Sequence, residues 1–184
     1  MPKRTDTRDR VVRTAAHLFR AQGYHATGLN QVLAEGGAPK GSLYFHFPGG
    51  KEQLAVEAVT LSGADLRASL TSALDADPDP VEALRRVVEL LGEGLLASDF
   101  RNGCPVTTVA LDASAESEPI RLACEDAYAS WQRAIADRVG DEDSATAVLA
   151  AVEGALVLAR TRRSLAPLHA VAARLGALLE RPAP

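Results

Sequence analysis

Five side chains able to donate hydrogen bonds to anions lie close together between positions 40 and 51. They are Lys40, Ser42, Tyr44, His46 and Lys51. Ammonium, hydroxyl and imidazole groups gathered in this way can bind the phosphate oxygens of a nucleic acid and the acceptor atoms of its bases. Glycines and prolines surround them, so the segment must turn sharply on either side of the groups it presents.

The sequence around these groups predicts two short helices joined by a tight turn. Thr27 is the expected N-cap of the first helix, which the Gly36 and Gly37 pair ends. The second helix is expected to run from Pro39 to residues 45–47, because proline is favoured in a first helical turn. Two short helices around a glycine-containing turn form a helix-turn-helix, whose second helix lies in the major groove of DNA.

The second helix would offer its first residues to the base edges. Lys40 can reach the O6 and N7 atoms of guanine or a phosphate, and Gly41 allows the backbone to approach closely. Tyr44 can donate its hydroxyl to a phosphate and pack its ring on a thymine methyl group. The residues predicted to contact DNA are Thr27, Ala38, Pro39, Lys40, Gly41, Ser42, Tyr44, Phe45, His46 and Lys51.

Structural alternatives exist for several of these residues. Tyr44 could be a core aromatic, but Leu43 and Phe47 stand four positions apart and fill the inward face, which leaves Tyr44 on another face. A capping or packing role stays open for His46, and a merely solvated position stays open for Ser42. Burial therefore decides between contact and packing roles.

Charge is distributed unevenly along the chain. Residues 1–51 hold eight Lys and Arg side chains and three acidic ones, a net charge of +5, whereas the remainder carries −9 within a total of −4. A basic segment on an acidic remainder is typical of a protein that touches phosphates with one part only. A coding bias towards arginine and alanine could explain why all three lysines fall in the first part, but it does not explain the change of sign.

Composition excludes several other classes. Two cysteines, Cys104 and Cys124, form no zinc-finger or disulfide framework and indicate a reducing compartment, with the cytoplasm expected. Neither a signal-peptide core nor an apolar run of about 18 residues is found in the sequence, so no membrane association is expected. A redox switch between the two cysteines stays open, although small buried hydrophobic groups are the ordinary role.

An enzymatic function finds little support in the motifs. The Gly36 to Ser42 stretch resembles a phosphate-binding loop, but the lysine after its second glycine is missing and no strand precedes it. The four histidines have no metal-ligand spacing, and no nucleophile elbow or paired carboxylates are present. No catalytic residue, metal or cofactor is expected. A DNA-coating protein without a ligand is the third possibility, and the large acidic remainder argues against it.

Apolar residues recur at spacings of three and four throughout, which predicts an all-α fold of about nine helices. The helix-turn-helix head is assigned to residues 1–50 and a helical body to 51–184, beginning with a long helix at Lys51. The expected helices are 7–21, 27–35, 39–47, 51–76, 81–98, 105–114, 119–139, 144–162 and 167–180.

Two sets of residues in the body are candidate binding surfaces. Apolar and polar side chains on its middle helices could line a ligand pocket, although ordinary core packing is the alternative: Leu61, Leu66, Leu70, Leu95, Cys104, Thr107, Thr108, Leu111, Tyr128, Trp131 and Glu153. The last two helices carry apolar stripes that either complete the monomer core or face a second subunit: Val148, Val152, Leu156, Leu168, Val171, Leu175 and Leu178.

The segment Lys40-Gly-Ser-Leu-Tyr-Phe-His-Phe47, with Lys51 following, resembles the DNA-binding head of the TetR/AcrR family of transcriptional regulators. The 102–106 and 153–156 segments of the body resemble the LmrA/YxaF-like subgroup of that family. The resemblance implies a homodimeric repressor held together by its last two helices. It also implies a palindromic DNA operator, a small-molecule inducer bound in the body, and DNA contacts at the matching residues. Gly28 departs from the family pattern, which usually has Thr or Ser there.

Overall fold

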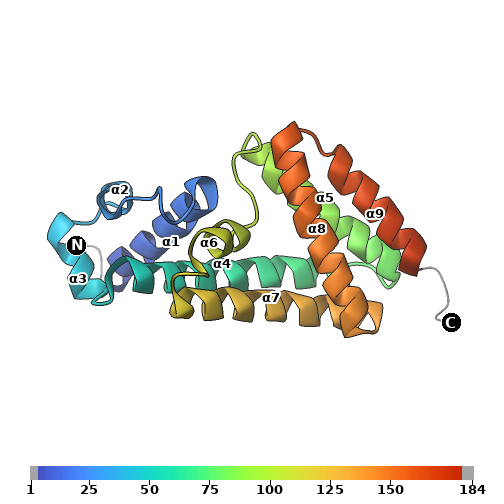
Figure 1. Cartoon of the computed structure of the whole chain (residues 1–184), viewed down its shortest axis with the longest axis horizontal. Helices are drawn as coiled ribbons and strands as arrows, with labels where there is room; N and C mark the ends of the chain where they lie inside the picture. The colour runs from blue at the N-terminus through green and yellow to red at the C-terminus, as the bar shows by residue number, and fades with distance from the viewer. Residues whose placement is uncertain (1–3, 180–184) are drawn as a thin grey trace. The chain divides into compact units, whose positions relative to one another are not determined.

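The structure consists of α-helices and the loops between them. The computed structural model describes residues 4–179, with the side chains of residues 4–6, 40, 178 and 179 outside the description. Within that range it contains nine α-helices, one short 3-10 helix and no strand (Figure 1). The all-α fold expected from the helical spacing of apolar residues is therefore confirmed.

The helices begin and end close to the expected positions, within three residues at every end. In chain order they are α1 Arg4–Gln22, α2 Leu29–Glu35, η1 Lys40–Ser42, α3 Leu43–His46, α4 Gly50–Asp75, α5 Pro80–Ala97, α6 Thr107–Ala113, α7 Glu118–Val139, α8 Glu142–Arg162 and α9 Ala166–Leu179. The turn η1 is the 3-10 helix.

The chain forms two compact units that differ from a simple division at Lys51. The first unit extends to Asp65 and also includes Cys104–Ala127, whereas the second consists of Leu66–Gly103 and the residues from Tyr128 onward. Two of the three boundaries lie inside α4 and α7, and the third lies between Gly103 and Cys104 in the loop that joins α5 to α6. Helix α6 therefore groups with the helix-turn-helix segment, although it lies far from that segment in the sequence. The functional division into residues 1–50 and 51–184 stays a prediction.

In the first unit, α1 packs against both α2 and α6. Each helix turns its apolar face inward, as the spacing of three and four requires. The largest side chains of this unit that are almost completely buried are Val11, Phe19, Val32, Phe47, Leu54, Val59, Val106 and Ile120.

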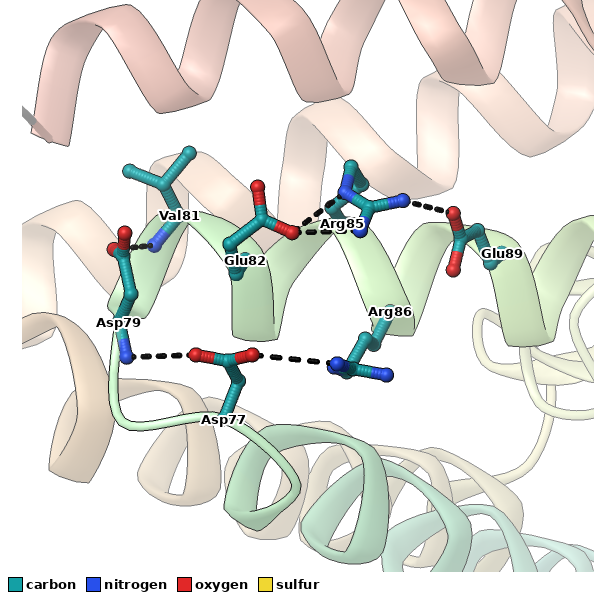
Figure 2. Close-up of polar contacts among 7 residues, drawn as sticks. All are labelled: Asp77, Asp79, Val81, Glu82, Arg85, Arg86 and Glu89. Atoms are coloured by element: carbon teal, nitrogen blue, oxygen red, sulfur yellow. Dashed lines mark hydrogen bonds and ion pairs between the residues drawn. The ribbon is translucent and has the colours of Figure 1, made fainter.

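In the second unit, α9 packs against α5 and α8. Helix α5 begins with Asp79 as its N-cap and Pro80 in its first turn, and the Asp79 carboxylate accepts the backbone N–H of Val81 at 2.9 Å. Figure 2 shows this cap beside Asp77, which accepts hydrogen bonds from the Asp79 backbone and from Arg86. Those two contacts lower the pKa of Asp77. The cap explains why α5 begins directly after the loop that carries Asp77 and Asp79.

Helix α8 is long and apolar enough to cross a membrane by length and composition, and it is the one such helix among the described residues. A core helix of a soluble protein passes the same test. Val148, Val152 and Leu156 are buried against the rest of the single chain, so α8 takes part in the packing of the second unit.

Candidate nucleic-acid interface

The turn between α2 and η1 is tight, and its geometry requires glycine at positions 36 and 37. Helix α2 ends at Gly36, whose N–H donates to Val32 O at 2.8 Å, and a Cβ at Gly36 would lie 2.9 Å from that same oxygen. Gly37 follows with a φ of +63°, a conformation that L side chains rarely adopt. Glycine is therefore required at the two positions for different reasons. A side chain at position 36 would clash with the Val32 carbonyl, and position 37 has a left-handed backbone.

The second helix of the motif begins as a 3-10 turn and continues as a short α-helix, where a single helix was expected. Pro39 precedes η1 in an extended conformation, and the Ser42 N–H donates to Pro39 O at 2.9 Å. The Ser42 hydroxyl donates to the same oxygen at 2.7 Å. That proton is already used, so Ser42 must rearrange before it can donate to a phosphate. Gly41 is exposed, and nothing lies within 4 Å of where its Cβ would be.

Burial separates two inward-facing from two outward-facing side chains in and just after α3, as the sequence predicted for Leu43, Phe47 and Tyr44. Leu43 and Phe47 are buried, with exposed fractions of 3% and 0%, whereas Tyr44 and Phe45 are 70% and 61% exposed. Because residues four apart share a helix face, the buried pair fixes the helix and directs Tyr44 outward. Large aromatic side chains facing water beside a polar backbone turn are typical of a binding surface.

Four other predicted contact residues lie at the same motif. His46 is half-buried, with its ring centroid 5.1 Å from that of Phe45 and 6.3 Å from that of Phe47. Ala38 is half-buried and donates its N–H to Leu33 O, and Pro39 is exposed. The side chain of Lys40 lies outside the described part of the chain.

Lys51 stands in the first turn of α4, which begins at Gly50. Its ammonium lies 4.5 Å from the ring centroid of Tyr24 and 3.5 Å from His25 O. Partial burial lowers the pKa of Lys51. The cation therefore stabilises the turn after α1 in this structure, and a phosphate contact by Lys51 stays a prediction.

Thr27 differs from the expectation in two respects. The N-cap of α2 is Gly28, with no side-chain hydrogen bond to the helix, so the capping role predicted for Thr27 is wrong. Thr27 is completely buried, and its hydroxyl donates to Gly23 O at 2.6 Å and accepts from the Gln22 amide at 3.2 Å. In this structure the hydroxyl faces the interior of the turn, where a phosphate has no access.

Replacing Thr27 with valine is expected to lower the free energy of unfolding by about 1 to 3 kcal/mol, because the buried Gly23 carbonyl loses its donor. Denaturant unfolding would measure this loss. Wild-type stability combined with weaker DNA binding would instead return Thr27 to the set of contact residues.

The sequence matches two family profiles that together cover most of the chain. The tetR family of bacterial regulatory proteins matches residues 11–58, and the C-terminal domain described as transcriptional regulator LmrA/YxaF-like matches residues 80–174. The HTH-type transcriptional regulator LmrA of Bacillus subtilis strain 168 is 36% identical, over 96% of this chain and 98% of its own. The chain belongs to the TetR family.

Other comparisons agree with membership of the TetR family. The HTH-type regulator YxaF of the same Bacillus strain is 35% identical over 98% of this chain and 99% of its own. The crystal structure of reduced NemR from E. coli shares the fold, with a TM-score of 0.83 and 21% identity over 97% of this chain and 100% of that chain. The TetR family consists of DNA-binding transcriptional regulators, so this chain is a regulator and not an enzyme.

The residues predicted to line a ligand pocket are divided between the two compact units. Leu61, Cys104, Thr107, Thr108 and Leu111 belong to the first unit, and Leu66, Leu70, Leu95, Tyr128, Trp131 and Glu153 belong to the second. Leu70, Leu95, Cys104 and Trp131 are buried, and Leu111 is 80% exposed. Leu111 lies on the outer side of α6, so it is removed from the candidate pocket. Thr108 donates to Cys104 O, the ordinary back-bond of a helical threonine.

A cavity of about 390 Å³ lies between α5 and α9 of the second unit, and its lining includes none of those residues. Its walls are formed by Val81, Arg85, Val88, Glu89, His169, Ala172, Ala173, Gly176 and Ala177. Arg85 is held between Glu82 and Glu89 on α5 (Figure 2), so its charge is already compensated. No sequence pattern predicts this cavity, because it depends on how closely two distant helices approach.

The residues predicted to form the dimer interface are mostly core residues. Five of the seven are buried in the single chain, Val171 is half-buried, and the side chain of Leu178 lies outside the described part. The buried five are Val148, Val152, Leu156, Leu168 and Leu175. Their assignment to an interface is corrected, because α9 packs on α5 and α8 and its apolar stripe is used there.

Exposed apolar residues on another face of α8 remain available. Val157 and Leu158 are 52% and 47% exposed. Ala147, Ala150, Gly154 and Thr161 are also exposed, at spacings that place them on the same side of the helix. This surface, which we call the α8 outer face, is formed by six uncharged residues, and the exposed Asp143 and Arg162 lie one turn before Ala147 and one turn after Leu158.

The two cysteines are buried thiols that are not joined in a disulfide. Burial raises the pKa of the Cys124 thiol to about 11, and a hydrogen bond with Ser114 opposes the shift only in part. Because the thiolate is the reactive form, a redox role for Cys124 is disfavoured.

In a Cys104→Ala variant, Cys124 is expected to resist thiol reagents at pH 8, since a rise of about two pKa units lowers the thiolate fraction roughly a hundredfold. The contribution of Cys124 to stability should be independent of pH below about 9 and should be lost progressively from there to about 11. In that range the unfolded chain loses the thiol proton and the folded chain keeps it. Native labelling as fast as that of the denatured chain would contradict this expectation.

Sequence reasoning missed the residues that hold the turn between α1 and α2. Asp112 and Glu116, at and just after the end of α6, contact Tyr24 and His25 across about ninety positions of sequence. No local pattern marks such a contact. The nearest local signal is Gly23, which by itself indicates only the end of a helix.

Proposed function

We propose that this regulator is a homodimeric repressor that binds a palindromic DNA operator in the cytoplasm and is released by a small-molecule inducer. The observation that carries the proposal is the exposure of Tyr44 and Phe45 on a helix that Leu43 and Phe47 anchor. Such a helix can enter a major groove without losing its packing. Tyr44, Lys40, Gly41, Phe45 and the neighbouring residues supply the contacts.

Dimerisation supports tight and specific binding. The second helix of the helix-turn-helix, formed by η1 and α3, is the recognition helix, and by itself it makes few contacts with DNA. A single head would therefore bind at the non-specific level, with a dissociation constant of roughly 10⁻⁴ to 10⁻⁶ M. Two heads at a fixed spacing reach about 10⁻⁸ to 10⁻¹¹ M. The α8 outer face supports dimerisation, because the large apolar side chains of Val157 and Leu158 are exposed there among uncharged residues.

Release requires an inducer that prefers the arrangement unable to bind the operator. A coupling of about 1 to 3 kcal/mol changes operator affinity by about 5- to 150-fold. Helix α4 supports this role, because it starts beside the recognition helix and continues into the second compact unit. The cavity between α5 and α9 has the size of a small-molecule site.

Selection of bound fragments from the source genome, followed by titration of the selected fragment at several salt concentrations, would test the proposal. A single palindromic sequence with salt-dependent affinity, released by a small molecule, is the expected result. Uniform binding to all fragments would favour a DNA-coating protein. Activation of the neighbouring gene by the bound protein would refute the repressor assignment and leave the DNA-binding assignment intact.

A further inference from the structure

The end of α6 is hydrogen-bonded to the turn that joins α1 to α2. The Asp112 carboxylate accepts the backbone N–H of Tyr24 at 2.9 Å. The Asp112 carbonyl lies 2.9 Å from His25 Nε2, and because a carbonyl can only accept, that nitrogen is the donor. One residue of α6 therefore contacts two successive residues of the turn.

Gly23 shows how closely the two segments approach. Its φ is +89°, and a Cβ at this position would lie 2.4 Å from Asp112 Oδ2. The N–H of Gly23 donates to Phe19 O, which closes the end of α1. Both the left-handed backbone and the missing side chain are needed for Asp112 to reach the Tyr24 amide.

Two further contacts lead to the same turn. The Lys51 ammonium lies over the Tyr24 ring, and the Glu116 carboxylate lies 3.5 Å from His25 Nε2. Glu52 in the first turn of α4 accepts a hydrogen bond from the Ser117 hydroxyl at 2.6 Å. The start of α4, the end of α6 and the residues that follow it therefore converge on residues 23–25.

The turn that follows α1 sets the direction of the DNA-binding helices. Residues 23–28 lead directly into α2, and the buried hydroxyl of Thr27 bonds back to Gly23 O. Because this bond closes the turn internally, residues 23–25 and the start of α2 are held together, and the contact with Asp112 links both to α6.

We propose that Asp112 is a positioning residue that fixes the orientation of the DNA-binding helices relative to α6. The inference rests on the DNA-binding function and goes beyond it by naming how α6 acts on the head. Asp112 touches no DNA in this proposal. Its carboxylate acts through the Tyr24 amide, whereas its backbone carbonyl, which any residue at this position supplies, accepts from the His25 ring. Loss of the carboxylate should therefore loosen the turn without unfolding the unit.

Three variants of the full chain would test the proposal on the operator selected from the genome. Asp112→Ala removes the acceptor of the Tyr24 amide, and Asp112→Asn keeps a carbonyl oxygen that can accept it. Asp126→Ala is the matched control, because Asp126 is an exposed acid of α7 in the same compact unit. Loss of one negative charge by itself should strengthen DNA binding slightly.

We expect Asp112→Ala to bind the operator at least about fivefold more weakly, the lower end of ordinary coupling between sites. Asp112→Asn should lie close to wild type, and Asp126→Ala should bind no more weakly than wild type. The slope of affinity against salt should be unchanged in all three. Equal affinities for Asp112→Ala and Asp126→Ala would overturn the proposal, as would a loss in Asp112→Asn equal to that in Asp112→Ala.

Hydrogen exchange separates this result from a failure of the proposed function, because it needs no DNA. The amides of residues 24–35 should exchange faster in Asp112→Ala than in wild type, with α7 unchanged. His25→Ala, which removes the second bond of the same contact at an exposed side chain, should act in the same direction. Unchanged exchange in both variants would refute the positioning role even if no operator were found.

Discussion

Replacing Tyr44 with alanine is expected to weaken operator binding by at least about 30-fold. The hydrogen bond from the Tyr44 hydroxyl to a phosphate and the ring contact with a thymine methyl group together contribute about 1 to 3 kcal/mol, and a dimer loses two such sets. Tyr44 is 70% exposed while Leu43 and Phe47 hold α3 in place. The fold should therefore survive the change, which a fluorescence-anisotropy titration of the selected operator and a thermal melt would measure together.

Leu111→Ala provides the comparison for Tyr44→Ala, because Leu111 is even more exposed and lies on α6, away from the recognition helix in sequence. It should leave operator affinity and dimer mass unchanged. Wild-type operator affinity of the Tyr44→Ala protein would contradict the assignment of α3 as the recognition helix. An equal loss in both variants would indicate a general effect of removing exposed apolar surface.

A chain carrying both Val157→Glu and Leu158→Glu is expected to be monomeric in sedimentation. Each protomer then places two carboxylates on the α8 outer face, and a two-fold axis brings four together, more than the one nearby Arg162 of each protomer can neutralise. Operator affinity should fall by roughly a hundredfold or more, from the range of paired heads towards non-specific binding.

Two single variants distinguish an interface on the α8 outer face from an interface on α5 and from a loss of folding. Leu96→Glu places a charge on a leucine of similar exposure on α5 and should remain dimeric. Val152→Glu introduces a charge at a buried position and should lower the free energy of unfolding rather than produce a folded monomer. If the Val157→Glu and Leu158→Glu chain stayed dimeric while Leu96→Glu became monomeric, the interface would lie on α5 and the α8 assignment would be wrong.

The sequence predicted the helices well, because helix formation depends on patterns within a few residues. The spacing of apolar side chains placed every helix to within three residues of its ends. It also predicted that Leu43 and Phe47 face inward and Tyr44 outward, since residues four apart share a face. The predicted N-cap of α2 was wrong: threonine is a favoured capping residue, but Gly28 and not Thr27 occupies the N-cap.

The sequence by itself determined the all-α fold, the helix-turn-helix and the family, because local spacing and a short motif carry that information. Tertiary structure decided which apolar faces are used within the chain, so Val152 and Leu175 became core residues. It alone brought Asp112 to the Tyr24 amide, 88 positions away. A contact between distant segments depends on the packing of whole helices, and no local pattern records it.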